Sequence, residues 1–185
     1  MSTKIVTDVV RLSYANVWTP KVPASQPDAK PKYSCSILIP KTDKKTVAAI
    51  NQAIDEAIKE GIGKFGGKIP NKATLKLPLR DGDVEREDDP AYKGHWFLNA
   101  SANEEHPPKI VDRRVQPILD HSEVYSGVYA KVALNFFAFA VSGNKGVACG
   151  LGNIQKIRDG EPLGSASDPE KEFSAVEDDE DDLGL

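Results

Sequence analysis

The chain has 185 residues, of which 39% are hydrophobic and 28% are charged. This length and composition indicate one soluble globular domain with an appendage and argue against two full domains. The longest apolar stretch, 136–141, is too short to span a bilayer, and residues 1–20 lack the apolar segment of a signal peptide. We therefore expect a cytoplasmic protein with no membrane partner.

The charge is divided unevenly along the chain. The net charge is −4 at pH 7, but residues 168–185 contain nine acidic side chains and one lysine. The other 23 basic and 19 acidic residues give residues 1–167 a charge of about +4. A run of like charges with little to bury cannot form a core. The sequence thus predicts a folded domain over 1–167 and a disordered acidic C-terminal tail over 168–185.

The first forty residues have the pattern of two strands separated by a loop. Aliphatic and β-branched residues predict a strand at 4–14. Four prolines within 18–32 predict a loop, because proline fixes φ and removes a backbone donor. A second strand is expected at 33–40, where proline closes an apolar run.

Residues 43–60 have the periodicity of a helix. Thr42 or Asp43 can cap its first turn, and Gly61 and Gly63 follow its last turn. The apolar residues recur at spacings of three and four, which places them on one face of the helix. They are Val47, Ile50, Ile54, Ala57 and Ile58.

The second half of the chain combines a long loop with short strands. Residues 64–95 are rich in Gly, Pro and Asp, which predicts a long irregular loop. Alternation within 129–141 predicts an inward face of Val132, Leu134, Phe136, Ala138 and Ala140. The expected strands are 96–102, 109–112, 129–141 and 146–157, the last two forming a hairpin across a turn at 142–146.

Aromatic and basic residues occur together in three clusters. A binder of single-stranded nucleic acid needs cations along the phosphates and flat rings on which any base can stack. The alternative is that the rings belong to the core and the cations to ordinary surface, and at least one of Phe136 and Phe137 must face the core. The clusters are Tyr14, Trp18, Lys21, Lys30, Lys32 and Tyr33; then Tyr92, Lys93, His95 and Trp96; and lastly Arg113, Arg114, Tyr125 and Tyr129.

The acidic tail has a functional interpretation beside a basic domain. A flexible polyanion tethered near a cationic groove has a high local concentration there. We hypothesise that it occupies the groove when nucleic acid is absent and recruits other proteins once it is displaced. Both interactions should weaken with salt through counterion release. The alternative is a tail that serves solubility alone.

Patterns for catalysis or cofactor binding are weaker. The carboxylates of 81–89 could hold Mg²⁺ for a nuclease, but they lie on one predicted loop, so a solvated acidic loop is preferred. The chain has neither a C-x-x-C pair nor a phosphate-binding P-loop, and Cys35 and Cys149 are expected to be reduced core thiols. We expect no cofactor, no metal and no catalytic residues. The histidines are not spaced as metal ligands: His95, His106 and His121.

Five blocks of the sequence resemble one known family. They are 11–18 (RLSYANVW), 33–41 (YSCSILIPK), 77–83 (LPLRDGD), 125–129 (YSGVY) and 143–147 (GNKGV). In this order they resemble bacteriophage single-stranded DNA-binding proteins, a family first catalogued as a domain of unknown function. The resemblance covers about residues 5–165. It implies an OB-type barrel, binding of single-stranded DNA in phage replication or recombination, and an acidic tail that contacts the replisome.

Together these patterns predict a mainly β fold, an OB-type five-stranded β-barrel with one main helix at about 43–60 and long loops. The chain is expected to coat single-stranded DNA without sequence specificity, and phage or host replication proteins are the expected partners of the tail. A metal-dependent nuclease and a DNA-mimicking interaction module remain as alternatives. The expected DNA contacts are Tyr14, Trp18, Lys21, Lys32, Tyr33, Arg80, Arg113, Tyr125 and Lys145. The expected partner contacts of the tail are Glu177, Asp178, Asp179, Glu180, Asp181, Asp182 and Leu185.

Overall fold

One mixed sheet and one long helix account for most of the computed structural model, which describes residues 2–22, 26–141, 143–163 and 176. The strands are β1 (Lys4–Val6), β2 (Val10–Lys21), β3 (Lys32–Pro40), β4 (Arg80–Asp81), β5 (His95–Asn103), β6 (Ile110–Val111), β7 (Tyr129–Val141) and β8 (Asn144–Arg158). The α-helices are α1 (Lys44–Glu60) and α2 (Gly82–Glu85). Four 3₁₀ turns lie at Ile62–Phe65, Lys72–Thr74, Pro90–Tyr92 and His121–Glu123.

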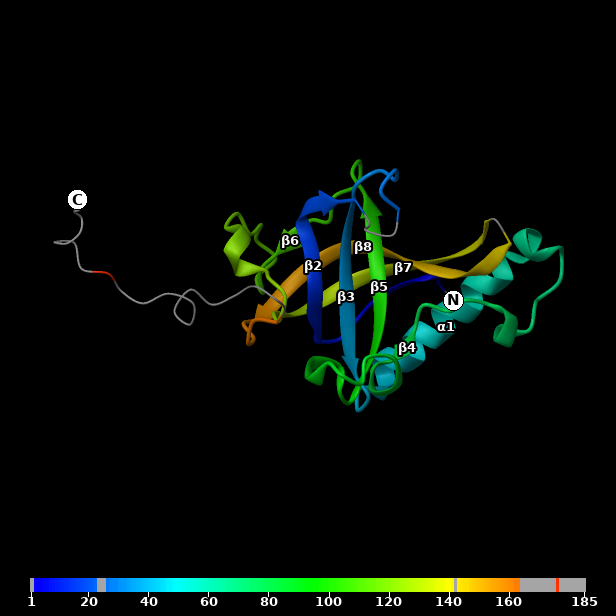
Figure 1. The fold of residues 1–185 in the computed structure, drawn as a ribbon, viewed down its shortest axis with the longest axis horizontal. Coiled ribbons are helices and arrows are strands. Elements are labelled where there is room, and N and C mark those ends of the chain that lie inside the picture. The colour runs from blue at the N-terminus through cyan, green and yellow to red at the C-terminus, as the bar shows by residue number, and fades with distance from the viewer. Residues whose placement is uncertain (1, 23–25, 142, 164–175, 177–185) are drawn as a thin grey trace.

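Five strands of the sheet close into a ring. β2 pairs with β3, β3 with β5, β5 with β8, β8 with β7, and β7 again with β2. The β5–β8 pairing is parallel and has a single register pair, Ser101 with Gly150, while the other four pairings are antiparallel. A five-stranded, partly open barrel of this kind is the OB architecture. In Figure 1, β2, β3 and β5 lie in front and β7 and β8 cross behind them.

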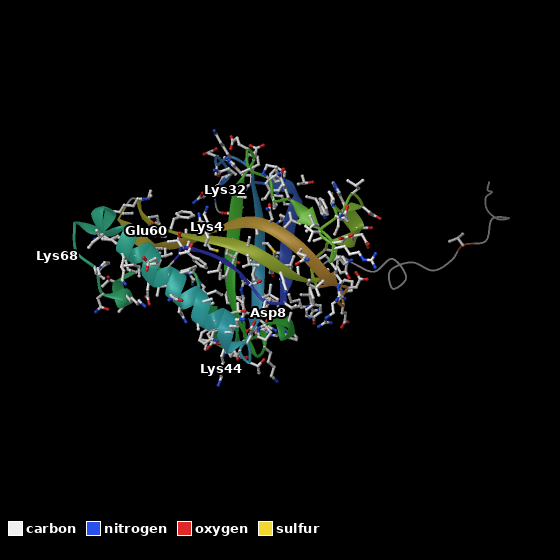
Figure 2. All side chains as sticks on the ribbon, turned by 180° about the vertical axis from the view of Figure 1, so that it is seen from behind. Lys4, Asp8, Lys32, Lys44, Glu60 and Lys68 are labelled. Carbon is white, nitrogen blue, oxygen red and sulfur yellow. The ribbon has the colours of Figure 1, made fainter. Side chains whose placement is uncertain are left out.

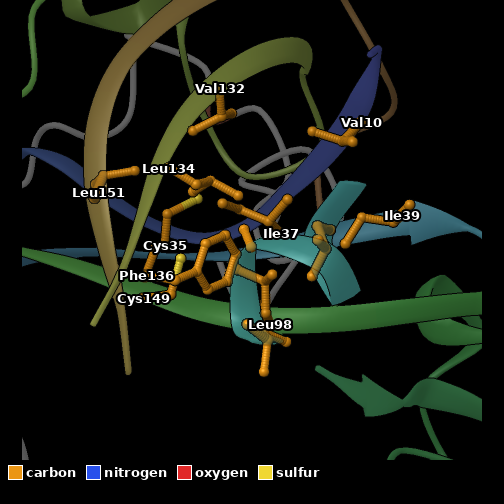
Figure 3. Packing of buried hydrophobic residues seen from close by; sticks show 14 of the residues in the cluster. Val10, Cys35, Ile37, Ile39, Leu98, Val132, Leu134, Phe136, Cys149 and Leu151 are labelled. Carbon is orange, nitrogen blue, oxygen red and sulfur yellow. The ribbon is translucent and has the colours of Figure 1, made fainter. Parts of the chain in front are cut away.

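The inward side chains of the ring form the core. Cys35, Ile37 and Ile39 alternate along β3 and point to the same side, where they lie near Leu98 of β5 and Phe136 of β7 (Figure 3). Burial raises the pKa of the Cys35 thiol to about 12, and it also raises the pKa of Cys149. Both cysteines are free and buried, so the prediction of reduced core thiols is confirmed.

The helix α1 packs its predicted apolar face against this core. Asp43 is the cap, because its side chain accepts a hydrogen bond from the Thr46 N–H at 3.1 Å. Val47 is only partly buried, whereas the other four predicted positions are buried. Among the described residues, no helix is both long enough and apolar enough to cross a membrane.

Two of the expected boundaries near the N-terminus are wrong. The strand expected at 4–14 is divided into β1 and β2, because the Asp8 N–H leaves the sheet and donates to Thr46 Oγ1 of α1. The loop expected at 18–32 begins later, since β2 continues through Pro20 to Lys21. Proline is tolerated there because β2 pairs with β7 only at its start, and so a backbone donor is not needed on that side.

The hairpin of β7 and β8 matches the prediction closely. Val132, Leu134, Phe136 and Ala138 are buried as expected, but Ala140 is exposed. The reason is that α1 ends at Glu60, and the following Gly61 already lies against Ala138. The hairpin therefore extends past the end of its covering helix.

Candidate nucleic-acid interface

The outer face of β2, β3 and β5 carries three rows of polar side chains. Register partners on neighbouring strands share a face, because side chains alternate between the two faces along each strand. None of the nine side chains in these rows is acidic; they are hydroxyl, amide and ammonium groups. The rows are Ser13–Ser36–Asn99, Asn16–Ser34–Ser101 and Lys21–Lys32–Asn103.

This polar face opens toward the connection between β2 and β3. Along β3, Ser36 is buried, Ser34 is half-buried, and Lys32, in the last of the three rows, is exposed. Lys32 lies at one end of the ring and Lys44, where α1 begins, lies at the other (Figure 2). In OB folds the second and third strands and the loop before the second strand bind oligonucleotides. The corresponding elements here are β3, β5 and the β2–β3 connection.

Tyr14 projects from a β-bulge at the edge of this face. The β2–β3 register shifts between Ser13 and Asn16, and Tyr14 has a φ of 47° and is 56% exposed. A left-handed backbone strains a bulky residue and persists only where neighbours hold it. Asn16 Nδ2 donates to the Tyr14 carbonyl at 3.3 Å, and the Ala15 N–H donates to Ser126 Oγ at 3.0 Å. The fold therefore holds an exposed ring in a strained position.

Trp18 and Tyr33 are partly buried and pack against the core. Trp18 Nε1 donates to the Val124 carbonyl at 3.0 Å. Its ring stacks on His121, with 4.1 Å between the ring centroids and 9° between the planes. Tyr33 lies on the inward side of β3 and packs against the core. Of the first predicted cluster, the structure thus brings Tyr14, Lys21 and Lys32 onto the polar face.

Two further predicted contacts are basic residues far along the chain. Arg80 Nη1 forms an ion pair with Glu85 Oε1 at 2.8 Å. Arg80 is the register partner of Phe97, near the start of β5. Lys145 lies at the end of the β7–β8 hairpin, which extends away from the polar face in Figure 1. The carbonyl of Lys145 accepts a hydrogen bond from the Lys76 N–H at 2.9 Å. The structure does not bring either side chain into the polar rows.

Arg113 and Tyr125 lie in other parts of the structure. Arg113 lines a space of about 620 Å³ together with residues from the end of β8. The Tyr125 hydroxyl donates to the Gly160 carbonyl at 2.9 Å and accepts from the Gly160 N–H at 3.1 Å. Tyr125 thus anchors the segment that follows β8. The predicted tail contacts, 177–182 and Leu185, lie outside the described residues.

The acidic segment after β4 is more ordered than the predicted solvated loop. Lys41 Nζ lies 2.7 Å from a carboxylate oxygen of Asp81 and 2.7 Å from one of Asp83. These hydrogen bonds raise the pKa of Lys41, and the same contact with Lys41 lowers the pKa of Asp83. Asp83 also accepts the Gly94 N–H at 2.9 Å. Both carboxylates therefore serve as anchors for the segment.

Two residues at this face, Arg86 and Asn99, are not among the contacts predicted from the sequence. Both line a pocket with Tyr14 on the outer side of β2, β3 and β5. Arg86 stands within the acidic run 85–89, so counting charges assigned it to an acidic loop. Asn99 stands in an apolar strand pattern and has no neighbouring motif. The cross-strand register with Ser36 identifies Asn99, whereas Arg86 is identified by its tertiary contact with the Tyr14 ring.

The segment after β8 runs back to the edge of the polar face. The Leu163 N–H donates to the Ser126 carbonyl at 2.8 Å, and Ser126 also holds the Tyr14 bulge. Leu163 packs against the small outer cluster of Leu38, Tyr92 and Phe97. Residue 163 thus lies beside the polar face.

Solved structures of phage proteins resemble this fold. The single-stranded DNA-binding protein of bacteriophage Enc34, solved in complex with single-stranded DNA, has a TM-score of 0.70 and 26% identity over 88% of this chain and 90% of its own. The protein gp2.5 of bacteriophage T7, also a single-stranded DNA-binding protein, has a TM-score of 0.62 and 14% identity over 92% and 94%. The likeness to the T7 protein confirms the predicted OB-like fold.

Sequence comparisons lead to the same group. A protein designated p50 from Acyrthosiphon pisum secondary endosymbiont phage 1 is 28% identical over 85% of each chain. A family model described as the single-stranded DNA-binding protein of Enterobacter phage Enc34 matches residues 3–183. The match spans nearly the whole chain and confirms the resemblance predicted from the five sequence blocks. The chain belongs to this family of phage single-stranded DNA-binding proteins, which are not enzymes.

Proposed function

We propose that the chain binds single-stranded DNA without sequence preference along the outer face of β2, β3 and β5, and coats it during phage replication or recombination. The observation that carries this proposal is the set of three polar rows without a carboxylate, with the exposed Tyr14 ring beside them. Ammonium groups suit phosphates, and an aromatic ring stacks on any base. Family membership and the DNA-bound Enc34 relative support the proposal.

The pairing of Lys21 with Lys32 adds a physical argument. These residues are direct register partners on β2 and β3, and both are exposed. Like charges directly opposite each other destabilise a strand pair. A phosphate group between them would remove that repulsion, so the pair suits a polyanionic ligand. The contacts predicted elsewhere remain predictions: Trp18, Tyr33, Arg80, Arg113, Tyr125 and Lys145.

We further propose that the acidic tail competes with DNA for this face and, once released, recruits phage or host replication proteins in the host cytoplasm. The position of Leu163 supports this, because the chain passes the edge of the face there. Glu177, the first of six consecutive acids, stands fourteen positions after Leu163. An extended segment of that length reaches about 45–50 Å. The acids are therefore within reach of the polar rows.

A binding titration tests the main proposal. Fluorescence anisotropy with a labelled thymidine 30-mer and with mixed-sequence strands of the same length should give affinities within about threefold of each other, because backbone charge and stacking carry little sequence information. Duplex DNA of equal length serves as the comparison. Strong preference for one sequence, or no binding at low salt, would contradict the proposal. Strands should stay intact with Mg²⁺ present.

Replacing Lys32 should change the salt dependence of binding. We expect Lys32→Ala to lower the slope of log affinity against log salt by about one, because one phosphate contact is lost. Titrations at four or more salt concentrations measure this slope. Lys59→Ala, which removes an exposed lysine at the far end of α1, is the matched control and should leave the slope unchanged. Equal slopes in all three proteins would exclude Lys32 from the phosphate path.

A further inference from the structure

A pocket of about 340 Å³ opens on the outer side of the barrel, beside the Tyr14 bulge. Its walls come from β2, β3, β5 and the residue that follows α2. The volume is at the lower end of the range for small-molecule sites, about 300–1,000 Å³, and so is large enough for one nucleotide rather than an extended ligand. It is lined by Tyr14, Ser34, Cys35, Ser36, Arg86 and Asn99. None of these residues is acidic.

Arg86 is held over aromatic rings instead of over carboxylates. Its Cζ lies 5.9 Å from the ring centroid of Tyr14, 5.5 Å from that of Tyr92 and 5.7 Å from that of Phe97. Within the described residues its guanidinium makes no ion pair, although acidic residues surround it in the sequence. Cation–π contacts use none of the N–H donors, so the exposed guanidinium of Arg86 can still donate to a phosphate, whose geometry it matches.

The segment that carries Arg86 is fixed to the barrel at two places. Lys41 binds both Asp81 and Asp83 just before it. After it, the hydroxyl of the fully buried Tyr92 donates to Ser36 Oγ at 3.0 Å, at the floor of the pocket. A binding group on a fixed segment loses little entropy when a ligand arrives. The position of Arg86 relative to Tyr14 is therefore set before any ligand binds.

The remaining walls offer hydrogen-bonding groups. Ser34 Oγ accepts from Asn16 Nδ2 at 3.3 Å, which leaves its hydroxyl hydrogen free to donate. The Asn99 amide is exposed and has no side-chain hydrogen bond to any described residue. An amide both donates and accepts, so it suits the edge of any base.

We propose that this pocket binds one nucleotide of a bound single strand, with its base stacked on Tyr14, its phosphate on Arg86 and its base edge on Asn99 and Ser34. This inference rests on the proposed DNA-binding function and names one nucleotide site within it. Asn16 acts as a positioning residue, since it donates to both the Tyr14 carbonyl and Ser34. The bulge and its strain serve to present the Tyr14 ring to the base.

Substitutions at Tyr14 distinguish the contribution of its ring to DNA binding from that of its backbone conformation. Tyr14→Gly keeps the left-handed backbone, which glycine adopts without strain, and removes the ring. We expect it to weaken binding of a thymidine 30-mer by about 5- to 150-fold, the range for loss of one base stack, at an unchanged salt slope. Its thermal midpoint should be equal to or above that of the wild type. Tyr14→Phe should retain wild-type affinity.

Arg86→Ala should lower the salt slope by about one, because Arg86 contacts a phosphate. The control is Lys59→Ala, which also removes one exposed positive charge, at the far end of α1, and should leave the slope unchanged. All measurements use the full chain. If Arg86→Ala and Lys59→Ala have the same slope as the wild type, and Tyr14→Gly binds as the wild type does, the nucleotide pocket is overturned while DNA binding stands.

Photocrosslinking directly identifies the residue that contacts a DNA base. A thymidine strand with 5-iododeoxyuridine, bound to the wild-type chain and irradiated, should crosslink to Tyr14, and mass spectrometry of the digested protein should identify that residue. Crosslinks confined to other residues would overturn the pocket and leave DNA binding in place. A wild-type chain that binds no strand would overturn the proposed function and the pocket together.

Discussion

Removal of residues 168–185 is expected to tighten binding of single-stranded DNA, by about tenfold or more near 0.05 M salt and by little near 0.5 M. The removed segment carries a charge of −8, while residues 1–167 carry about +4. A tethered polyanion that competes for the polar face lowers the apparent affinity for DNA. Salt screens the tail and the DNA alike, so the difference should shrink as salt rises. Anisotropy titrations of both chains over a range of salt measure this effect.

A full-length control distinguishes charge from length. Replacing each acid of 177–182 by its amide, Glu→Gln and Asp→Asn, keeps the tail length and removes its six consecutive charges. This chain should bind DNA nearly as tightly as the truncated one. Equal affinities of the wild-type and truncated chains at all salt concentrations would reject competition by the tail, while DNA binding itself would stand.

Phe136→Ala is expected to destabilise the protein by about 3–5 kcal/mol, whereas Phe137→Ala should cost less than about 1 kcal/mol. The two residues are neighbours on β7, but Phe136 is 1% exposed and Phe137 is 46% exposed. Removing the Phe136 ring leaves a cavity among Cys35, Ile37 and Leu98 in the barrel core. Removing the Phe137 ring mainly exposes a surface that water already reaches.

Urea denaturation followed by circular dichroism measures both stabilities with one method. Because the pair differs only in the face of β7 on which each ring lies, it controls for composition and strand position. A shift of the β7 register by one residue would exchange the two faces. A larger loss from Phe137→Ala than from Phe136→Ala would therefore contradict the described sheet.

Local periodicity in the sequence was sufficient to predict the helix and the strand that pack one face against the core. The helix at 43–60 was visible because its apolar residues recur every three or four positions, and α1 occupies Lys44–Glu60. The strand at 129–141 was visible from strict alternation and matches β7 in full. The loop predicted from Pro20 onward is wrong, because Pro20 lies within β2. Whether a strand tolerates proline depends on its partner strands, and these come from other parts of the chain.

The sequence by itself determined the basic domain, the acidic tail and the family, because charge and block order can be read along the chain. Tertiary structure alone decided which cations and rings share a face. Lys21 and Lys32 lie opposite each other because they are register partners on β2 and β3. Arg86 lies near Tyr14 because contacts of Lys41 and Tyr92 fix its segment to the barrel. These contacts join residues many positions apart, so their energies depend on how the barrel closes and leave no periodic signal in the sequence.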